Sequence, residues 1–301
     1  MVARSSLGPD VVIAGAARSG TSALAAQLSE HPGIDPGKVK EPNYFSRHLD
    51  RGERWYESNF ASRSDGMLRL DASTSYTSPL YPQALQHLAA TSPGAYVIFS
   101  VRQPTERALS HYLLRRHYFS IDDAPTFGAA LHGSSLYVDH SDYSHWLPLL
   151  SDMFGSDRLL VVPFELVTAQ PRQATEEICR RLGLEPPPDA AKEAERHRNS
   201  VVEYRNERVR RMASTFRRSR AYPAVRSLVG AGQLRKARGL VTRAPSLPTT
   251  DESMQSCSPE QLAELQALDE RAGEATRWYL EAQDARLELR WAPLSFAAAV
   301  A

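Results

Sequence analysis

Short apolar runs alternate with longer mixed segments along the first 185 residues. The runs 11–14, 67–71, 96–101 and 158–162 are short, rich in aliphatic residues and close to turn residues, which is typical of buried strands. Segments with helical patterns lie between and after them and predict helices over 21–30, 81–90, 104–117, 144–154 and 170–182. Strands that alternate with helices favour a parallel sheet with right-handed crossovers. The pattern therefore predicts a three-layer α/β fold, with a central parallel sheet flanked by helices.

The pattern changes after this core. Residues 184–200 are rich in proline and charge, 196–243 carry 14 Lys and Arg against two acidic residues, and 244–259 are typical of a loop. From Pro259, one helix is expected to about Arg271 and a second to about Arg286. We predict a single domain over 1–301, with a core at 8–185, an Arg-rich helical insertion or lid and a loop at 186–258, C-terminal helices at 259–292 and a tail at 293–301.

Composition narrows the possible classes of protein. With 42% hydrophobic and 24% charged residues and a net charge of +1, the chain of 301 residues is typical of a globular protein with a sizeable core. Its two cysteines, Cys179 and Cys257, form no disulfide framework and no metal-binding spacing. The first ten residues do not resemble a signal peptide, and no apolar run approaches the ~20 residues of a membrane span. We expect a cytoplasmic protein.

The sequence GAARSGTSAL at 15–24 joins the first predicted strand to the first helix. Gly15 and Gly20 have the spacing of the phosphate-binding loop G-x-x-x-x-G-K-[ST], and Ser22 matches its last position. Thr21 replaces the lysine, and the cation within the loop is Arg18. Backbone N–H groups at a helix N-terminus attract anions, so the segment predicts an anion site in a P-loop-like fold. The loop lacks the lysine that holds a triphosphate, which disfavours a nucleoside triphosphate.

Three motifs occur in a characteristic order. The loop is followed by KEPNYF at 40–45 and VRQPTERALSHY at 101–112. Together they resemble the PAPS-dependent sulfotransferases, most of all the branch with heparan sulfate and bacterial carbohydrate or small-molecule sulfotransferases. The resemblance covers about residues 10–185. It implies an enzyme that transfers a sulfuryl group from PAPS to a hydroxyl and leaves PAP, without a metal.

The resemblance also implies which residues bind the donor. Arg18 stands where many members have a catalytic lysine; it keeps the charge but cannot donate a proton. Arg102 and Ser110 match the pair that holds the 3′-phosphate. The residues expected around the 5′-phosphate are Ala17, Arg18, Ser19, Gly20, Thr21 and Ser22.

Glu41 matches the family's general base, which takes the proton of the acceptor hydroxyl. Lys40 beside it contacts the sulfonate, orients Glu41 or is solvated, and the sequence leaves these alternatives open.

The acceptor side is less well defined. Asp71 and Tyr76 belong to DASTSY, and both are expected to bind the acceptor. Alternatively, Asp71 orients Arg18 or caps the following turn. Ala72 replaces a lysine that is functional in some heparan enzymes, which weighs against a heparan-type acceptor. His140 is expected as a substrate contact or auxiliary base. His140 and His145 lack the spacing of metal ligands on one helix face, so no metal is expected.

The Arg-rich segment 196–243 has three interpretations. It is a solvated helical insertion, a lid that brings Arg198 and Asn199 to the donor, or a platform for an acidic acceptor or an anionic surface. Few aromatic residues lie between its arginines, so nucleic acid is not an expected partner. The expected partner is a hydroxyl-bearing small-molecule, carbohydrate or lipid-linked acceptor. The alternative function is a P-loop nucleotide kinase or phosphotransferase.

Overall fold

The structure is a computed structural model that describes residues 8–61, 66–186, 203–204, 212, 215–216, 242–243, 249–283, 289 and 291. Contacts divide the chain into two compact units. The first contains Met1–Arg107, Val138–His197 and Leu265–Leu294, and the second contains Ala108–Tyr137, Arg198–Glu264 and Ser295–Ala301. The predicted single domain over 1–301, with its four parts, stays a prediction.

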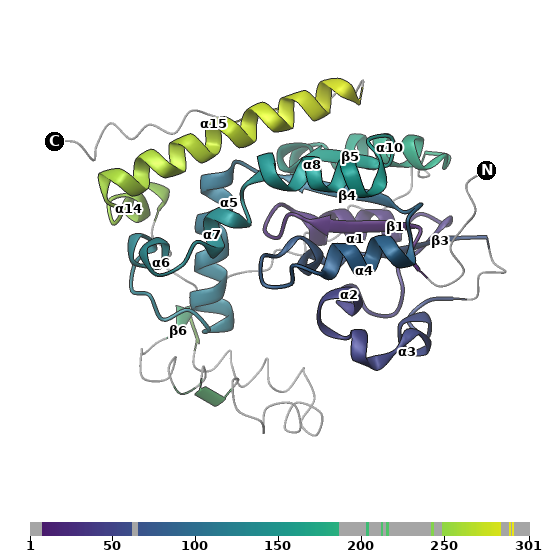
Figure 1. Cartoon of the computed structure of the whole chain (residues 1–301), viewed down its shortest axis with the longest axis horizontal. Helices are drawn as coiled ribbons and strands as arrows, with labels where there is room; N and C mark the ends of the chain where they lie inside the picture. The colour runs from purple at the N-terminus through teal and green to yellow at the C-terminus, as the bar shows by residue number, and fades with distance from the viewer. Residues whose placement is uncertain are drawn as a thin grey trace. The chain divides into compact units, whose positions relative to one another are not determined.

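A parallel sheet forms the centre of the first unit (Figure 1). Its five strands have the order β2-β3-β1-β4-β5, and every neighbouring pair is parallel. The strands are β1 (Val11–Gly15), β2 (Ile34–Asp35), β3 (Leu68–Asp71), β4 (Tyr96–Val101) and β5 (Leu159–Pro163). The predicted α/β fold is confirmed. Because β1 lies between β3 and β4, loops after these three strands meet at one edge of the sheet, where ligands bind in such folds.

Helices cover both faces of this sheet. Strand side chains alternate between the two faces, so each face has its own apolar cluster. On one face, Val12, Val97 and Val161 pack in one apolar cluster with residues of α4, α8 and α15. On the other face, Ile13, Ile98 and Val162 pack with residues of α1, α9 and α10. The helices of the first unit are α1 (Thr21–Ser29), α2 (Tyr44–Arg47), α3 (Glu53–Glu57), α4 (Ala84–Thr91), α8 (Tyr143–Phe154), α9 (Phe164–Ala169) and α10 (Pro171–Leu182), with 3-10 turns at Leu49–Arg51 and Thr74–Thr77.

The second unit contains shorter elements around α6 (Phe127–Gly133) and α14 (Thr250–Met254). The N–H group of Gly128 donates to Ser256 Oγ over 3.0 Å, and the Gln261 side chain donates to the Gly128 carbonyl over 2.9 Å. Three helices cross the boundary between the units: α5 (Pro104–Leu113), α7 (Leu136–Asp139) and α15 (Pro259–Ala282). A π-helical turn, Leu114–Phe119, continues α5, and the strands β6 (Glu203–Tyr204) and β7 (Thr242–Arg243) pair antiparallel.

Two predictions about the C-terminal region are wrong. The two helices expected after Pro259 are one continuous helix, α15, because buried residues such as Leu265, Leu268 and Ala272 form an unbroken apolar stripe through the expected break. The loop expected at 244–259 contains α14, which begins with a capping box between Thr249 and Glu252.

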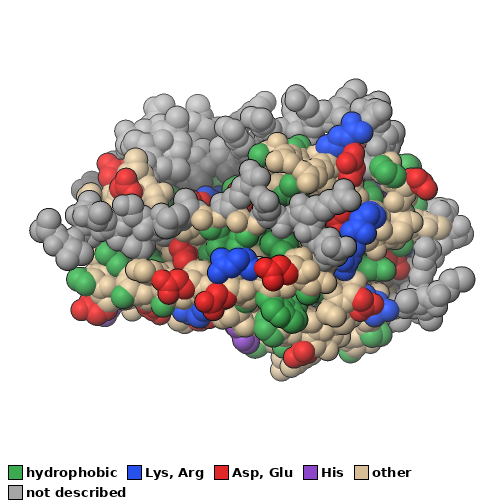
Figure 2. Space-filling view, turned by 90° about the horizontal axis from the view of Figure 1, so that it is seen from above, with side chains coloured by type: hydrophobic (Ala, Val, Ile, Leu, Met, Phe, Trp, Pro, Cys, Tyr) green, Lys and Arg blue, Asp and Glu red, His purple; other side chains and the backbone are tan. Residues whose placement is uncertain are grey.

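The described surface mixes charges of both signs. Figure 2 shows Lys or Arg side chains close to Asp or Glu side chains on one face, with apolar side chains between them. Among the described residues, no helix has the length and apolar character needed to cross a membrane.

Candidate functional site

The loop between β1 and α1 is held by the neighbouring strand β4. The N–H group of Ala16 donates to the Ser100 carbonyl over 2.8 Å, and Ser100 Oγ donates to the Ser19 carbonyl over 2.5 Å. Two loop residues have left-handed backbones, Arg18 with φ 75° and Gly20 with φ 79°. Glycine adopts this conformation without strain, whereas arginine does not. The sequence therefore folds into a compact turn with its backbone fixed.

This turn directs N–H groups at one place. The first N–H groups of a helix have no acceptor within the helix, and at α1 these belong to Thr21, Ser22 and Ala23. The Ala23 N–H instead donates to the Gly20 carbonyl, which leaves those of Thr21 and Ser22 for a ligand. Together with the helix dipole, this geometry favours an anion.

Two arginines, Arg18 and Arg102, bring positive charge to the same edge of the sheet. Burial and the nearby Arg102 guanidinium lower the pKa of Arg18 to about 10. Both effects disfavour the charged form of Arg18, and a bound anion would favour it. Arg18 and Arg102, which the motifs predicted, follow two neighbouring strands of the sheet, β1 and β4.

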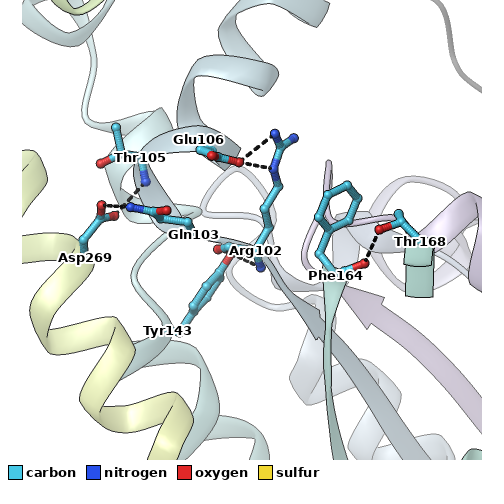
Figure 3. Close-up of polar contacts among 8 residues, drawn as sticks. All are labelled: Arg102, Gln103, Thr105, Glu106, Tyr143, Phe164, Thr168 and Asp269. Carbon is cyan, nitrogen blue, oxygen red and sulfur yellow. Dashed lines mark hydrogen bonds and ion pairs between the residues drawn. The ribbon is translucent and has the colours of Figure 1, made fainter. Parts of the chain in front are cut away.

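Arg102 follows β4 and is held in one orientation (Figure 3). Its Nε and Nη2 donate to Glu106 Oε2 over 3.1 and 2.9 Å, and its guanidinium lies 4.8 Å from the centre of the Phe164 ring. The Tyr143 hydroxyl accepts from the Arg102 N–H and donates to its carbonyl. Glu106 binds one side of the guanidinium, so Nη1 remains the group best placed to bind an anion.

The turn after Arg102 is supported by Asp269 of α15 (Figure 3). Asp269 accepts the Thr105 N–H over 2.8 Å and the Gln103 side-chain amide over 2.9 Å. Its carboxylate therefore lies at the N-terminus of α5, where negative charge is favourable. Sequence reasoning missed Asp269, since 166 residues separate it from Gln103.

Arg107 is a second residue that sequence reasoning missed. Its side chain is fully buried; Nε donates to Ser141 Oγ over 2.7 Å and Nη1 donates to the Ala17 carbonyl over 3.1 Å. This contact fixes the anion loop from α5. No pattern in TERALS separates a buried arginine from an exposed one.

Glu41 and Lys40 lie beside the loop. Lys40 Nζ donates to Ser22 Oγ over 3.0 Å and to Glu41 Oε1 over 2.6 Å. Both side chains are partly exposed, at 36% for Lys40 and 42% for Glu41. Lys40 therefore joins the carboxylate to the first turn of α1, which favours the interpretation that it orients Glu41.

Asp71 lies at the end of β3 in a fully buried site. It accepts three hydroxyl hydrogen bonds, from Ser73 over 2.6 Å, Tyr56 over 2.8 Å and Tyr76 over 2.7 Å. Burial raises the pKa of Asp71 to about 6, although the three donors act in the opposite direction. Asp71 and Tyr76 are at most 1% exposed, so the structure places them beneath the surface. Their acceptor-binding role stays a prediction.

The remaining predicted residues are His140, Ser110, Arg198 and Asn199. His140 is 8% exposed, and its Nε2 lies 2.9 Å from Ser78 Oγ. Ser110 lies on α5 in the part that belongs to the second unit, and its pairing with Arg102 stays a prediction. Arg198 and Asn199 lie outside the described residues. Within the described ranges, no group of three His, Cys, Asp or Glu residues has the geometry of a metal site.

Comparisons with known proteins find similar sequences among sulfotransferases. The model of the family described as "Sulfotransferase family" matches residues 43–188. Human heparan sulfate glucosamine 3-O-sulfotransferase 6 is 31% identical over 170 residues, which are 51% of this chain and 48% of the relative. The bifunctional heparan sulfate N-deacetylase/N-sulfotransferase 1 of Caenorhabditis elegans is 32% identical over 110 residues, 35% of this chain and 12% of that protein. The chain thus spans about half the length, or less, of these relatives.

A solved structure gives the same result. The crystal structure of a sulfotransferase from Alicyclobacillus acidocaldarius aligns with a TM-score of 0.53 and 26% sequence identity, covering 61% of this chain and 85% of the other. The resemblance predicted from the three motifs is confirmed, since these similarities support a PAPS-dependent sulfotransferase family for this chain.

Proposed function

We propose that this protein transfers a sulfuryl group from PAPS to the hydroxyl of a carbohydrate, glycolipid or small-molecule acceptor. The observation that carries the proposal is the anion-binding turn at the N-terminus of α1, with Arg18 within the turn and Arg102 after the neighbouring strand β4. A carboxylate, Glu41, is tied to the same helix through Lys40. This is an anion site next to a potential general base.

The residues present fit the two ends of PAPS. The loop N–H groups and Ser22 suit the 5′-phosphate, and Arg102 suits the 3′-phosphate, with Ser110 as its predicted partner. When bound, PAPS supplies the sulfuryl group. Arg102 fixes the far end of the donor, which orients the reacting end toward Glu41 and lowers the entropic cost of reaction.

The acceptor reacts through its hydroxyl oxygen. Glu41 takes the hydroxyl proton while the oxygen forms a bond to sulfur and the bond between sulfur and the phosphate oxygen breaks, leaving PAP. Arg18 stabilises the negative charge that develops on the oxygens around the sulfur. Lys40 holds the Glu41 carboxylate at the loop. No metal takes part in this proposal.

The relatives support a carbohydrate acceptor at a coarse level, since those named above are heparan sulfate enzymes. Ala72, in place of a lysine that is functional in some heparan enzymes, weighs against heparan sulfate itself. We therefore propose a hydroxyl acceptor of another carbohydrate, a glycolipid or a small molecule. The lid and platform interpretations of segment 196–243 rest on the sequence alone and remain proposals. The same holds for a cytoplasmic location.

Calorimetric titration with PAP tests this function. We expect metal-independent micromolar binding to the wild type and a loss of about 100-fold in Arg102→Ala, as expected for a charged hydrogen-bonding group of about 2 to 3 kcal/mol. Arg172→Ala is the matched control, because Arg172 also pairs with a glutamate at i,i+4 but lies on α10 and is 65% exposed.

The same titration distinguishes the proposed function from the alternative, a nucleotide kinase or phosphotransferase. Binding of ATP with Mg²⁺, with no response to PAP, would make the loop a nucleotide kinase loop and contradict the sulfotransferase proposal. Equal PAP affinity in the wild type and Arg102→Ala would contradict the role of Arg102.

A further inference from the structure

Glu41 lies in a segment without regular structure, between β2 and α2, yet a general base needs a fixed position. We infer that Asn43, Ser73 and Ser75 are positioning residues for Glu41, and that buried Asp71 anchors them to the sheet. The inference rests on the proposed function, because it assigns Glu41 the role of base.

Asn43 makes three contacts that define the turn after Glu41. Its side-chain amide donates to the Glu41 carbonyl over 2.8 Å, and its Oδ1 accepts from Ser75 Oγ over 2.6 Å. Its backbone N–H donates to Ser73 Oγ over 2.9 Å. Asn43 has a left-handed backbone with φ 51°, a conformation that asparagine tolerates better than most residues. Asn43 thus connects Glu41 to two serines that follow β3.

Ser73 transmits this connection to Asp71. The Ser73 hydroxyl has one proton, and it donates this proton to Asp71 Oδ1 over 2.6 Å. Its oxygen is then free to accept the Asn43 N–H. Ser73 is fully buried, as is Asp71, so water does not compete for these bonds. The direction of each bond in the chain from Asn43 to Asp71 is therefore determined.

Asp71 is a firm anchor because it ends a strand of the central sheet. Its other oxygen, Oδ2, accepts the hydroxyls of Tyr56 and Tyr76. Glu41, the proposed base, is thus held at two points. Lys40 holds its carboxylate, and Asn43 holds its backbone carbonyl.

The chain contains a matched pair of substitutions for a test. Ser73→Ala and Tyr56→Phe each remove one hydroxyl that donates to Asp71. Only Ser73 also accepts from Asn43 and so connects to Glu41. Ser75→Ala removes the separate contact with Asn43 Oδ1 and serves as a second variant if Ser73→Ala folds poorly.

Two readouts are measured on the full chain. The first is hydrogen–deuterium exchange of a peptide covering residues 40–46, which needs no acceptor. The second is kcat for transfer of ³⁵S from labelled PAPS to a simple carbohydrate hydroxyl acceptor, methyl glucoside, with PAP affinity from calorimetry. We expect Ser73→Ala and Ser75→Ala to raise exchange in this peptide about tenfold. We expect kcat to fall about 10- to 100-fold, with PAP affinity within twofold of the wild type. Tyr56→Phe leaves exchange and kcat within about twofold.

The outcomes separate the inference from the proposed function. If Tyr56→Phe changes exchange at 40–46 as much as Ser73→Ala does, the network is structural only and the inference is wrong. If exchange rises in both serine variants while kcat stays at the wild-type value, Glu41 positioning does not depend on this network and the inference is also wrong. If methyl glucoside accepts no sulfate, exchange alone decides. A wild type that fails to bind PAP contradicts the proposed function and leaves the exchange result to be judged separately.

Discussion

Arg18 combines features that are each unfavourable for folding. Its backbone is left-handed, its side chain is largely buried, and it lies near a second guanidinium, that of Arg102. Strained backbones and buried charges of this kind concentrate at functional sites, where a ligand compensates them. The residue therefore favours anion binding over local stability.

Arg18→Gly tests this balance. Glycine relieves the left-handed backbone and removes the buried charge, which offsets its own entropic cost of about 0.5–1 kcal/mol. We expect PAP affinity to fall at least tenfold while the free energy of unfolding, from urea denaturation, changes by less than about 1 kcal/mol. A loss of stability above about 2 kcal/mol, with PAP affinity unchanged, would show a structural role instead.

Asp71 makes a pH-dependent contribution to stability. Its pKa is raised to about 6 in the folded protein, above its ordinary value. The folded state thus holds the proton more tightly, so this carboxyl stabilises the protein at low pH and loses that contribution as pH rises from about 4 to 6. The contribution is roughly 2 to 3 kcal/mol.

Asp71→Asn removes this titration. We expect the difference in free energy of unfolding, wild type minus variant, to decrease between pH 4 and pH 7. Urea denaturation of both proteins at several pH values measures it, and each pH has the variant as its own control for other titrating groups. A difference that increases with pH would contradict the raised pKa.

At the level of elements, α15 supports the first turn of α5 through Asp269. Asp269→Ala removes the acceptor of the Thr105 N–H and of the Gln103 amide, so we expect the free energy of unfolding to fall by about 1 to 2 kcal/mol. PAP affinity should fall about three- to tenfold, because Arg102 immediately precedes this turn.

Glu270→Ala is the matched control on the same helix. Glu270 is exposed, and it accepts a hydrogen bond from Gln266 one turn earlier. We expect the Tm of this variant, from thermal denaturation, and its PAP affinity, from titration, to stay near the wild-type values. Equal losses of stability and of PAP affinity in both variants would mean that α15 acts only through the stability of its helix.

The elements were predicted where local patterns determine them. β4 has the predicted bounds, Tyr96–Val101, because a short apolar run between turns has few other solutions. The break expected near Arg271 was wrong, because burial of Leu268 and Ala272 continues the helix. α14 shows the opposite case, since its capping box was present in the sequence and was not used.

The candidate site was partly predictable for the same reason. Arg18, Glu41 and Arg102 belong to short motifs, and the parallel sheet brings its loops to one edge. Asp269 and Arg107 make their contacts across long stretches of sequence, and no local pattern marks them. The network of Asn43 and Ser73 likewise depends on the distance between two segments that only the fold determines.

For the whole molecule, PAP binding should raise thermal stability. At a ligand concentration about 1,000 times the Kd, binding to the folded state adds about 4 kcal/mol, so Tm should rise by about 5 to 10 °C. EDTA should leave this shift unchanged, because the proposed mechanism uses no metal. Differential scanning fluorimetry with PAP, EDTA and AMP measures it, and AMP, which lacks a 3′-phosphate, should give a smaller shift. An equal shift with AMP would contradict recognition of the 3′-phosphate.

The contact between α15 and α5 also affects how the protein is made. A ribosome releases the chain from its N-terminus, at about 5–20 residues per second, so the three motifs emerge on the order of ten seconds before Asp269. Until then the Thr105 N–H lacks its acceptor and the turn after Arg102 lacks its support. We therefore expect the donor-anchoring turn to be completed late in synthesis. A nascent chain that ends before residue 269 would hold all three motifs and still lack this support.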